Sequence, residues 1–484
     1  MKNLKVKQEG YLLVQTLVFG GVALIIISGL IAFATANIRL GRRVALSEQA
    51  FQIAEAGLEY YRWHLAHAPT DYTDGTGLPG PYTKNFYNKE GQVIGTFRLT
   101  ITPPALGSSL VTIESRGVPS ADASVSRTIV SELAIPSFGN FAAVTDAAMR
   151  FGAGTEVYGP VHSNDGLRFD GLAHNLVTSS VANYNDADHS GNNEFGVHTH
   201  VNAPPSSGVN DTFRALEAPP SAVPSRPDVF IAGRSFPVPE VSFDNLTTDL
   251  TEMQATASSS GRYFGGSGAS GYRIVLKTND TFDLYRVSSL MSVPSGCSDS
   301  GQDDWGSWST NSTTLLGNYA FPANGLIFLN DHVWVEGTVN GARITIIAAN
   351  IPDNNAANRK SLTVNNDVRY TNYDGSDVIA LIGQENVNVG MNSENDLRID
   401  AALIAQTGRV GRYFYESDCS PYDDRDTLTL YGTLVTALRY GFAYTDGSGY
   451  ETRSLIYDSF LLYSPPPFFP QTDDYHEVIS WKEI

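Results

Sequence analysis

The chain has 484 residues, which is long for one ordinary domain and leads us to expect two or three compact units. Its 32 basic and 51 acidic residues give a formal net charge of −19 with no basic stripe after Arg43, which argues against nucleic-acid binding and fits an exposed, soluble surface. Abundant Gly, Tyr and Phe beside many Asn, Ser and Thr favour extended β structure with frequent turns.

The first predicted element is a membrane-spanning helix. Met1–Gly10 carries three lysines, and Tyr11–Thr35 follows as 25 residues without a formal charge. At about 1.5 Å per residue this helix is about 37 Å long, enough to cross a hydrocarbon core of about 30 Å with some tilt. The lysines predict a cytoplasmic N-terminus, with everything after residue 36 outside.

Three interpretations compete for this segment. A secretory signal peptide would have a shorter apolar stretch and a better cleavage site than Ala32-Phe33-Ala34. A plain membrane anchor explains the hydrophobicity and the lysines equally well. In the third, the basic leader ends in Gly10 directly before an apolar helix that continues past the membrane, which resembles a type IV prepilin. That resemblance implies that a prepilin peptidase cuts between Gly10 and Tyr11, so that residues 1–10 are a leader.

Gln15 departs from the pattern of that family. It occupies the fifth mature position, where pilins usually carry a Glu that helps subunits dock. A neutral amide cannot form an ion pair with a neighbouring N-terminal amine, although it can donate and accept hydrogen bonds. The substitution favours a minor pilin or pseudopilin over a bulk filament subunit. Alternatively, Gln15 is only a tolerated polar residue in a membrane helix.

The helix is predicted to continue through residue 68 as an amphipathic segment, because apolar residues recur three, four or seven apart and no proline precedes Pro69. The run AFQIAEAGLE, residues 50–59, resembles the helix end of PilX-type minor pilins. This resemblance covers about the first 65 residues and implies three kinds of partner: the prepilin peptidase, other pilins and an inner-membrane assembly platform. Glu55 and Glu59, spaced four apart, are interpreted as a solvated face rather than as a catalytic pair.

Strands are predicted after the helix. Residues 69–135 contain alternating stretches at 93–101, 110–115 and 125–130, with a turn expected at Gly117-Val118-Pro119. They predict a small antiparallel sheet with the upper half of the helix on one face.

The rest of the chain is predicted to be a β-rich head. Residues 136–324 form a loop-rich β region continuous with it, and residues 325–484 contain short apolar strands separated by Asn, Asp and Gly. Such recurrence predicts a right-handed β-solenoid, with a β-sandwich as the alternative. A Pro-rich segment near the C-terminus, residues 461–470, is expected to lie extended on the body.

Histidines and aspartates between residues 160 and 200 raise the question of a metal. His198-Thr199-His200 would place both rings on one side of a strand, a spacing that metal sites use, but we interpret these histidines as polar loop and solenoid residues. Asp186 and Asp188 begin a D-x-D-x-S-G run that is a candidate calcium site, and Glu194 could reach back to it. Val197 stands where an EF-hand needs its acid, which excludes a full EF-hand. A further acidic loop could also bind calcium: Asp423, Asp424 and Asp426.

No catalytic motif appears in the sequence: there is no G-x-S-x-G, H-E-x-x-H, Walker loop or Rossmann glycine pattern. We therefore expect no enzyme, no catalytic residue and no resident cofactor. The leading prediction is a minor pilin or pseudopilin that displays a large head for assembly or adhesion. The alternative is a surface-anchored polysaccharide-processing enzyme on a β-helix, which rests on fold analogy alone.

Cys297 and Cys419 are the two cysteines of the chain. Each lies in a polar, turn-rich stretch, and both are expected outside the cytoplasm, where disulfides persist. A bond between them would close a loop of 122 residues. We predict this disulfide, with two exposed free thiols as the alternative.

Overall fold

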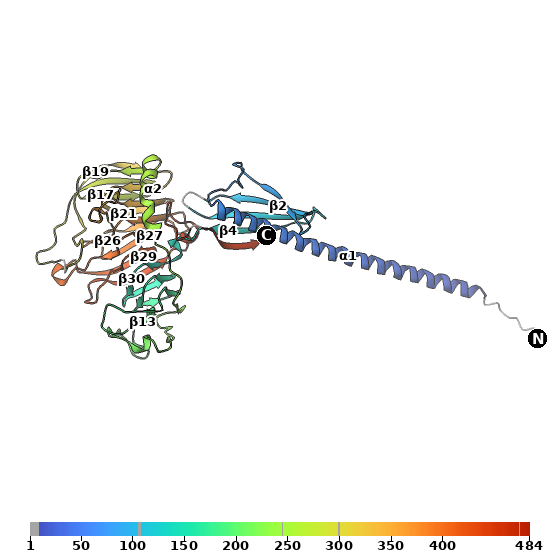
Figure 1. Ribbon diagram of the computed structural model, residues 1–484, viewed down its shortest axis with the longest axis horizontal. Coiled ribbons are helices and arrows are strands. Elements are labelled where there is room, and N and C mark those ends of the chain that lie inside the picture. Colours follow the sequence, from blue (N-terminus) through green and yellow to red (C-terminus); the bar gives the residue numbers. More distant parts are fainter. Residues whose placement is uncertain (1–8, 105–107, 244, 299–300, 474) are drawn as a thin grey trace, which may run out of the picture. The chain divides into compact units, whose positions relative to one another are not determined.

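The computed structural model describes residues 9–104, 108–243, 245–298, 301–473 and 475–484 (Figure 1). The chain divides into two compact units. The helix–sheet unit comprises Met1–Pro103, Val111–Leu133 and Val478–Ile484. The large unit comprises Pro104–Leu110 and Ala134–Glu477.

Helix α1 (Glu9–His67) dominates the helix–sheet unit. Among the described residues, one helix is long and apolar enough to cross a membrane, and it is this one, from Tyr11 onward. Its side chains are exposed from Tyr11 through Val44, and burial begins only near Leu46. Exposure of so much apolar surface to water is unfavourable, and the helix is compatible with a membrane anchor.

The sheet of this unit has the order β1-β2-β3-β4-β31, and β1 through β4 pair antiparallel, as predicted. Its strands are β1 (Tyr82–Tyr87), β2 (Val93–Thr102), β3 (Val111–Pro119), β4 (Arg127–Ala134) and β31 (Glu477–Glu483). The turn expected at Gly117-Val118-Pro119 is wrong, because β3 continues to Pro119 and pairs with Gly95 of β2. Strand β31 returns from the far end of the chain, where Trp481 packs edge-on against Phe51.

The upper part of α1 packs on this sheet through one face. Its buried residues recur at helical spacing: Leu46, Ala50, Ile53, Ala54, Leu58, Tyr61 and Leu65. Two glycines allow a close approach. A Cβ on Gly117 would lie 2.0 Å from the Ala50 carbonyl oxygen, and a Cβ on Gly57 would lie 2.9 Å from the Phe97 ring. Small residues on both elements therefore set the distance between helix and sheet.

The large unit is mainly β, as predicted, and is built on parallel ladders. The longest ladder joins ten strands in this order: β16 (Arg262–Phe264), β20 (Leu326–Leu329), β22 (Arg343–Ala348), β25 (Val378–Gly383), β27 (Asp396–Ala405), β29 (Asp424–Thr436), β5 (Ala143–Thr145), β8 (Val161–Ser163), β11 (Val177–Ser179) and β15 (Arg234–Ser235). The chain order is broken where β29 pairs with β5, so residues 136–324 and 325–484 share one sheet.

Two further parallel ladders run beside the first. One joins β17 (Gly271–Lys277), β21 (Val333–Val339), β23 (Leu362–Thr363), β26 (Val387–Val389) and β28 (Val410–Arg412). The other joins β21, β24 (Val368–Tyr370), β27, β29, β30 (Gly449–Tyr457), β7 (Thr155–Tyr158) and β10 (Leu172–Ala173). Apolar side chains from all three ladders form one buried core. No closed sheet is found among the residues that the structure describes, and the solenoid assignment stays a prediction.

Smaller elements complete the large unit. They are the hairpin strands β18 (Thr281–Leu290) and β19 (Thr310–Ala320), the three-stranded sheet β14 (Val197–His198), β9 (Leu167–Phe169) and β6 (Met149–Phe151), the pair β12 (Asn183–Tyr184) and β13 (Glu194–Phe195), and the helices α2 (Asn245–Ser259) and α3 (Phe460–Tyr463). The expectation that residues 461–470 lie extended is wrong for their first part, because Phe460–Tyr463 form α3. The prolines that follow lie on the body, where Arg343 donates to the carbonyl oxygens of Ser464 and Pro465, at 3.1 and 2.6 Å.

Candidate functional site

The predicted processing residues lie at the start of α1. Gly10 and Tyr11 belong to its first turns, while residues 1–8 of the leader lie outside the described residues. Tyr11 is 75% exposed, and Gln15 is exposed among apolar neighbours. The processing role of Gly10 and Tyr11 and the docking role of Gln15 stay predictions.

The AFQIAEAGLE run has a packing role in the structure. Ala50, Ala54 and Gly57 are buried against the sheet, whereas Glu55 and Glu59 point to solvent. The expectation that the two glutamates form a solvated face is confirmed. The small residues of this run therefore serve the packing of the helix on the sheet.

The two aspartates predicted to bind calcium have different surroundings. Asp188 is held by Arg439, whose Nη1 and Nη2 lie 2.7 and 2.6 Å from its two oxygens. Asp186 points instead among histidines. The structure thus does not bring both carboxylates to one open calcium loop, and Asp423, Asp424 and Asp426 lie elsewhere, around the start of β29.

Asp186 belongs to a buried group that we name the histidine–acid cluster: Asp186, His189, Glu194, His198 and His200. The Glu194 carboxylate is its centre. Glu194 Oε2 lies 3.0 Å from His189 Nε2 and 3.2 Å from His198 Nε2, and Glu194 Oε1 lies 3.1 Å from His200 Nε2. Asp186 Oδ2 lies 3.6 Å from both His189 Nε2 and His198 Nε2. The two carboxylates and three imidazoles converge on one point.

Short strands and tight loops assemble this cluster. Glu194 is on β13 and His198 on β14, and β14 pairs with β9, which places Arg168 nearby. Arg168 Nη1 is 3.6 Å from Asp186 Oδ2. Burial would raise the pKa of Asp186, but the histidine His198, the Asp188 backbone N–H and Arg168 lower it well below its usual range. Hydrogen bonds and histidine charge likewise lower the pKa of Glu194 against the opposing effect of burial.

Sequence reasoning identified parts of this cluster without uniting them. It noted the His198–His200 pair and the reach of Glu194, but it assigned Asp186 to calcium with Asp188. The remaining two histidines of the region lie elsewhere: His162 bonds to Thr178 and Asn164, and His174 pairs with Glu156. A stronger signal was available in the spacing, because Asp186, His189, Glu194, His198 and His200 are all potential metal ligands within fifteen residues.

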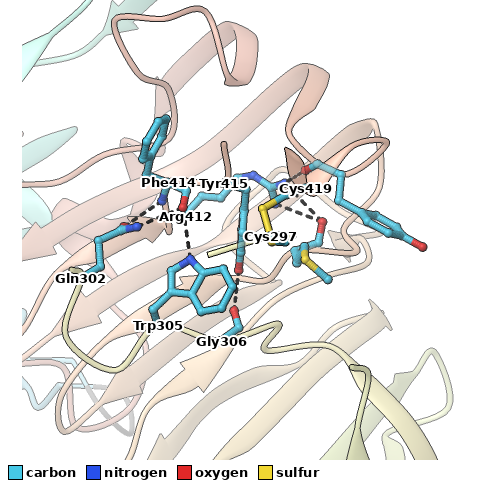
Figure 2. The surroundings of a disulfide bond; sticks show 10 residues. Cys297, Gln302, Trp305, Gly306, Arg412, Phe414, Tyr415 and Cys419 are labelled. Atoms are coloured by element: carbon cyan, nitrogen blue, oxygen red, sulfur yellow. Dashed lines mark hydrogen bonds between the residues drawn. A yellow bond between two sulfur atoms is a disulfide. The ribbon is translucent and has the colours of Figure 1, made fainter. Parts of the chain in front are cut away.

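Cys297 and Cys419 form a disulfide, with their Cα atoms 4.6 Å apart (Figure 2). It joins the loop after β18 to the short helix Ser417–Cys419. Cys419 is fully buried, so the polar setting expected from its neighbours in the sequence is wrong. Aromatic residues distant in sequence, among them Trp305 and Tyr415, cover it.

Hydrogen bonds join the same two segments beside the disulfide (Figure 2). Gln302 Nε2 and Trp305 Nε1 donate to the Phe414 carbonyl oxygen at 3.0 and 3.2 Å, and the Tyr415 hydroxyl donates to the Gly306 carbonyl at 2.8 Å. The guanidinium of Arg412 lies 4.6 Å from the Tyr415 ring centre. The disulfide and these hydrogen bonds together hold the loop after β18 against the segment that contains Phe414 and Tyr415.

A pair of carboxyl groups, Glu385 and Asp304, lies in the same unit. Partial burial, followed by the charge of Asp304 and a hydrogen bond to it, raises the pKa of Glu385 to about 7. Since the two groups hydrogen-bond directly, they are closer than the about 5–9.5 Å at which paired carboxyls of glycosidases stand. This pair gives no support to a glycan-processing site.

The Glu385 carboxyl predicts a pH dependence of stability. Its pKa rises from 4.5 to about 7 on folding, so between these values the folded state holds a proton that the unfolded state releases. Stability should therefore fall as pH rises through this window and level off above about 7. Glu385→Gln should flatten that slope and raise Tm at pH 8 by about 2–4 °C. Thermal unfolding across pH measures it, with exposed Glu240→Gln as the control; an unchanged slope in Glu385→Gln would contradict the assignment.

Comparison with known proteins gives little. No protein-family profile and no curated protein matches the sequence. Among solved structures, the competence-associated pilin ComZ from Thermus thermophilus aligns over 91% of this chain and 97% of that chain, with a TM-score of 0.32 and 12% identity. A likeness this distant carries no inference about fold or function, so both rest on the residues and contacts above.

Proposed function

We propose that the chain is a minor pilin or pseudopilin-like component of a type IV pilus or a related secretion system. The observation that carries this proposal is the division of α1. Its first half is apolar and exposed, and its second half packs on an antiparallel sheet through Ala50, Ala54 and Gly57. A helix that anchors at one end and carries a folded unit at the other suits a subunit held in a membrane and then drawn into a filament.

The remaining parts of the proposal follow from this anchor. The lysine-rich end faces the cytoplasm, a prepilin peptidase removes residues 1–10, and Tyr11–Thr35 lies in the membrane until assembly. Partners are other pilins and an inner-membrane assembly platform. The large unit is displayed outside the cell, where it serves assembly or adhesion.

We further propose that the large unit is a β-solenoid of the PilX-associated kind. The parallel ladders support this, since each strand adds to the one before it in register, as in β27 on β29. A β-sandwich would need antiparallel sheets instead. The alternative of a polysaccharide-processing enzyme stays a prediction and would need a groove with two separated carboxyl groups.

Gln15 offers a test of assembly. If Gln15 docks the subunit, Gln15→Leu should insert in the membrane normally and appear severalfold less in sheared surface filaments, because the hydrogen-bonding amide is lost. Quantitative immunoblotting of membrane and filament fractions measures both. Ser28→Leu is the matched control, since Ser28 is another exposed polar residue of the same apolar segment. Equal incorporation of wild type and Gln15→Leu would show that Gln15 has no docking role.

The broader test is the presence of the chain in filaments. Filaments sheared from cells that express the other pilins should contain the wild-type chain at low abundance. Its restriction to the membrane fraction, in cells that assemble filaments normally, would contradict a pilin role and leave a plain membrane anchor.

A further inference from the structure

We propose that the histidine–acid cluster binds one divalent transition-metal ion of the zinc class, which fixes the loops between residues 183 and 214. The cluster lies wholly in the large unit. Asp186, His189, Glu194 and His200 each place one ligand atom within 4.8 Å of the others, and His198 adds a further imidazole at the same point. The proposal is independent of whether the chain is a pilin.

The distances between the donor atoms fit a tetrahedral ion. Bonds of 2.0–2.1 Å to nitrogen and oxygen imply that tetrahedral ligands stand about 3.4 Å apart. Asp186 Oδ2, His189 Nε2, Glu194 Oε2 and His198 Nε2 approach that value, with four of their separations between 3.0 and 3.6 Å. His200 Nε2 faces the other oxygen of Glu194, at 3.1 Å. Little rearrangement is needed to admit an ion.

The hydrogen bond made by Nδ1 of His200 leaves Nε2 of a neutral ring without a hydrogen to donate. Its Nδ1 lies 2.7 Å from the Asn210 carbonyl oxygen, which can only accept, so Nδ1 carries the hydrogen. In a neutral ring Nε2 is then a lone pair, and it faces the Glu194 carboxylate. Two acceptors at this distance repel unless a proton or a cation lies between them. Metal-bound histidines commonly show this arrangement, with the far nitrogen donating to a carbonyl.

His198 has the same orientation as His200, and its Nε2 has no hydrogen-bond partner among the described residues. Its Nδ1 faces the Phe195 carbonyl oxygen at 3.3 Å, and its Nε2 points at the two carboxylates. Within the described part of the chain, His198 Nε2 and Asp186 Oδ2 are buried polar atoms without a hydrogen-bond partner. Burying such atoms unpaired is unfavourable, and a shared cation would remove that cost.

The charge of the surroundings fits a divalent cation. One guanidinium pairs directly with the cluster: Arg168 Nη1 lies 3.6 Å from Asp186 Oδ2. Arg168 also pairs with two carboxylates outside the cluster, those of Asp170 and Asp211. With neutral imidazoles, the two buried carboxylates of the cluster, Asp186 and Glu194, leave it an excess of negative charge. A divalent ion balances it, and so would protonation of two of the histidines.

The donor types select the class of metal. Calcium takes six to eight oxygens, and Asp188, the second aspartate of the expected calcium loop, is occupied by Arg439. Imidazole nitrogens suit zinc, cobalt, nickel and copper. His198 and His200 are fully buried, so the site is closed, which is typical of structural rather than catalytic zinc. The ion would hold β13, β14 and their loops together.

The experiment uses the full-length chain purified in detergent. After chelation and dialysis it is equilibrated with zinc, washed, and analysed for metal by mass spectrometry and for thermal stability. We expect about one zinc per chain and a Tm about 5 °C above that of the chelated protein. Cobalt in place of zinc should give the visible absorption of a tetrahedral ion. No retained zinc, cobalt, nickel or copper together with an unchanged Tm would overturn the proposal and leave protonated histidines as the explanation.

Matched variants assign the ligands. His189→Gln should weaken zinc binding by more than about 100-fold, because His189 Nε2 is one of the four tetrahedral donors, whereas His174→Gln should bind as wild type does, because His174 pairs with Glu156 outside the cluster. A folded His189→Gln variant that keeps the wild-type zinc affinity would contradict this ligand set. Should the variant not fold, the comparison of chelated and loaded wild type still decides whether the site exists.

Discussion

Removing the Cys297–Cys419 disulfide is expected to produce the largest loss of stability. The bond closes a loop of 122 residues, which in the chain-entropy model stabilises the native state by about 4–5 kcal/mol. The double variant Cys297→Ser/Cys419→Ser should therefore lower the Tm of the large unit by about 5–10 °C. Its loop around Trp305 should also become more sensitive to protease, since the disulfide anchors that loop to the segment of Tyr415.

Two measurements check this prediction. Thermal unfolding compares the double variant with Ser295→Ala, an exposed change in the same loop that leaves the bond intact. Thiol labelling of the denatured wild-type chain without reductant should modify no cysteine. Two labelled thiols per chain would contradict the disulfide directly.

The second large effect is expected at Gly117. A Cβ at this position would lie 2.0 Å from the Ala50 carbonyl oxygen and 2.6 Å from the Ala54 nitrogen, and both are backbone atoms that cannot turn aside. Even Gly117→Ala should therefore push helix from sheet and destabilise the helix–sheet unit by about 3 kcal/mol. Because this unit holds the anchor helix, the same change should reduce incorporation into filaments.

Gly41, a glycine of helix α1, provides the control for Gly117. Gly41 has open space around its Cβ position, so Gly41→Ala should leave stability unchanged or raise it by up to about 1 kcal/mol, as expected from helix propensity. Hydrogen exchange of peptides from residues 46–65 and 111–119 separates the two outcomes. Equal protection in Gly117→Ala and wild type would show that the helix does not rest on β3 as closely as described.

Local patterns in the sequence predicted the helix–sheet unit well. The uncharged run after Gly10 and the helical spacing beyond it predicted α1 to within one residue of its end at His67. Alternation predicted β2 through β4. Strand β31 could not be paired with this sheet in advance, because its partner β4 lies about 350 residues earlier and nothing local records such a pairing.

The large unit was less predictable for a related reason. Its strands were recognised singly, but the pairing of β29 with β5 reverses the order of the chain and has no local signal. The histidine–acid cluster was not predicted as a unit for the same reason. Asp186 and Asp188 are close in sequence, yet the Asp188 side chain faces Arg439 and the Asp186 side chain faces His198. Side-chain direction in a short loop depends on partners that only the fold brings near.

Processing at Gly10 tests the central proposal most directly. The full chain is produced in membranes with and without an active prepilin peptidase, and its N-terminus is identified by mass spectrometry. The pilin account predicts that Tyr11 becomes the first residue when the peptidase is present, and that Gly10→Phe leaves the longer form. A wild-type chain that keeps Met1, beside a control pilin that is fully cleaved in the same cells, would contradict it.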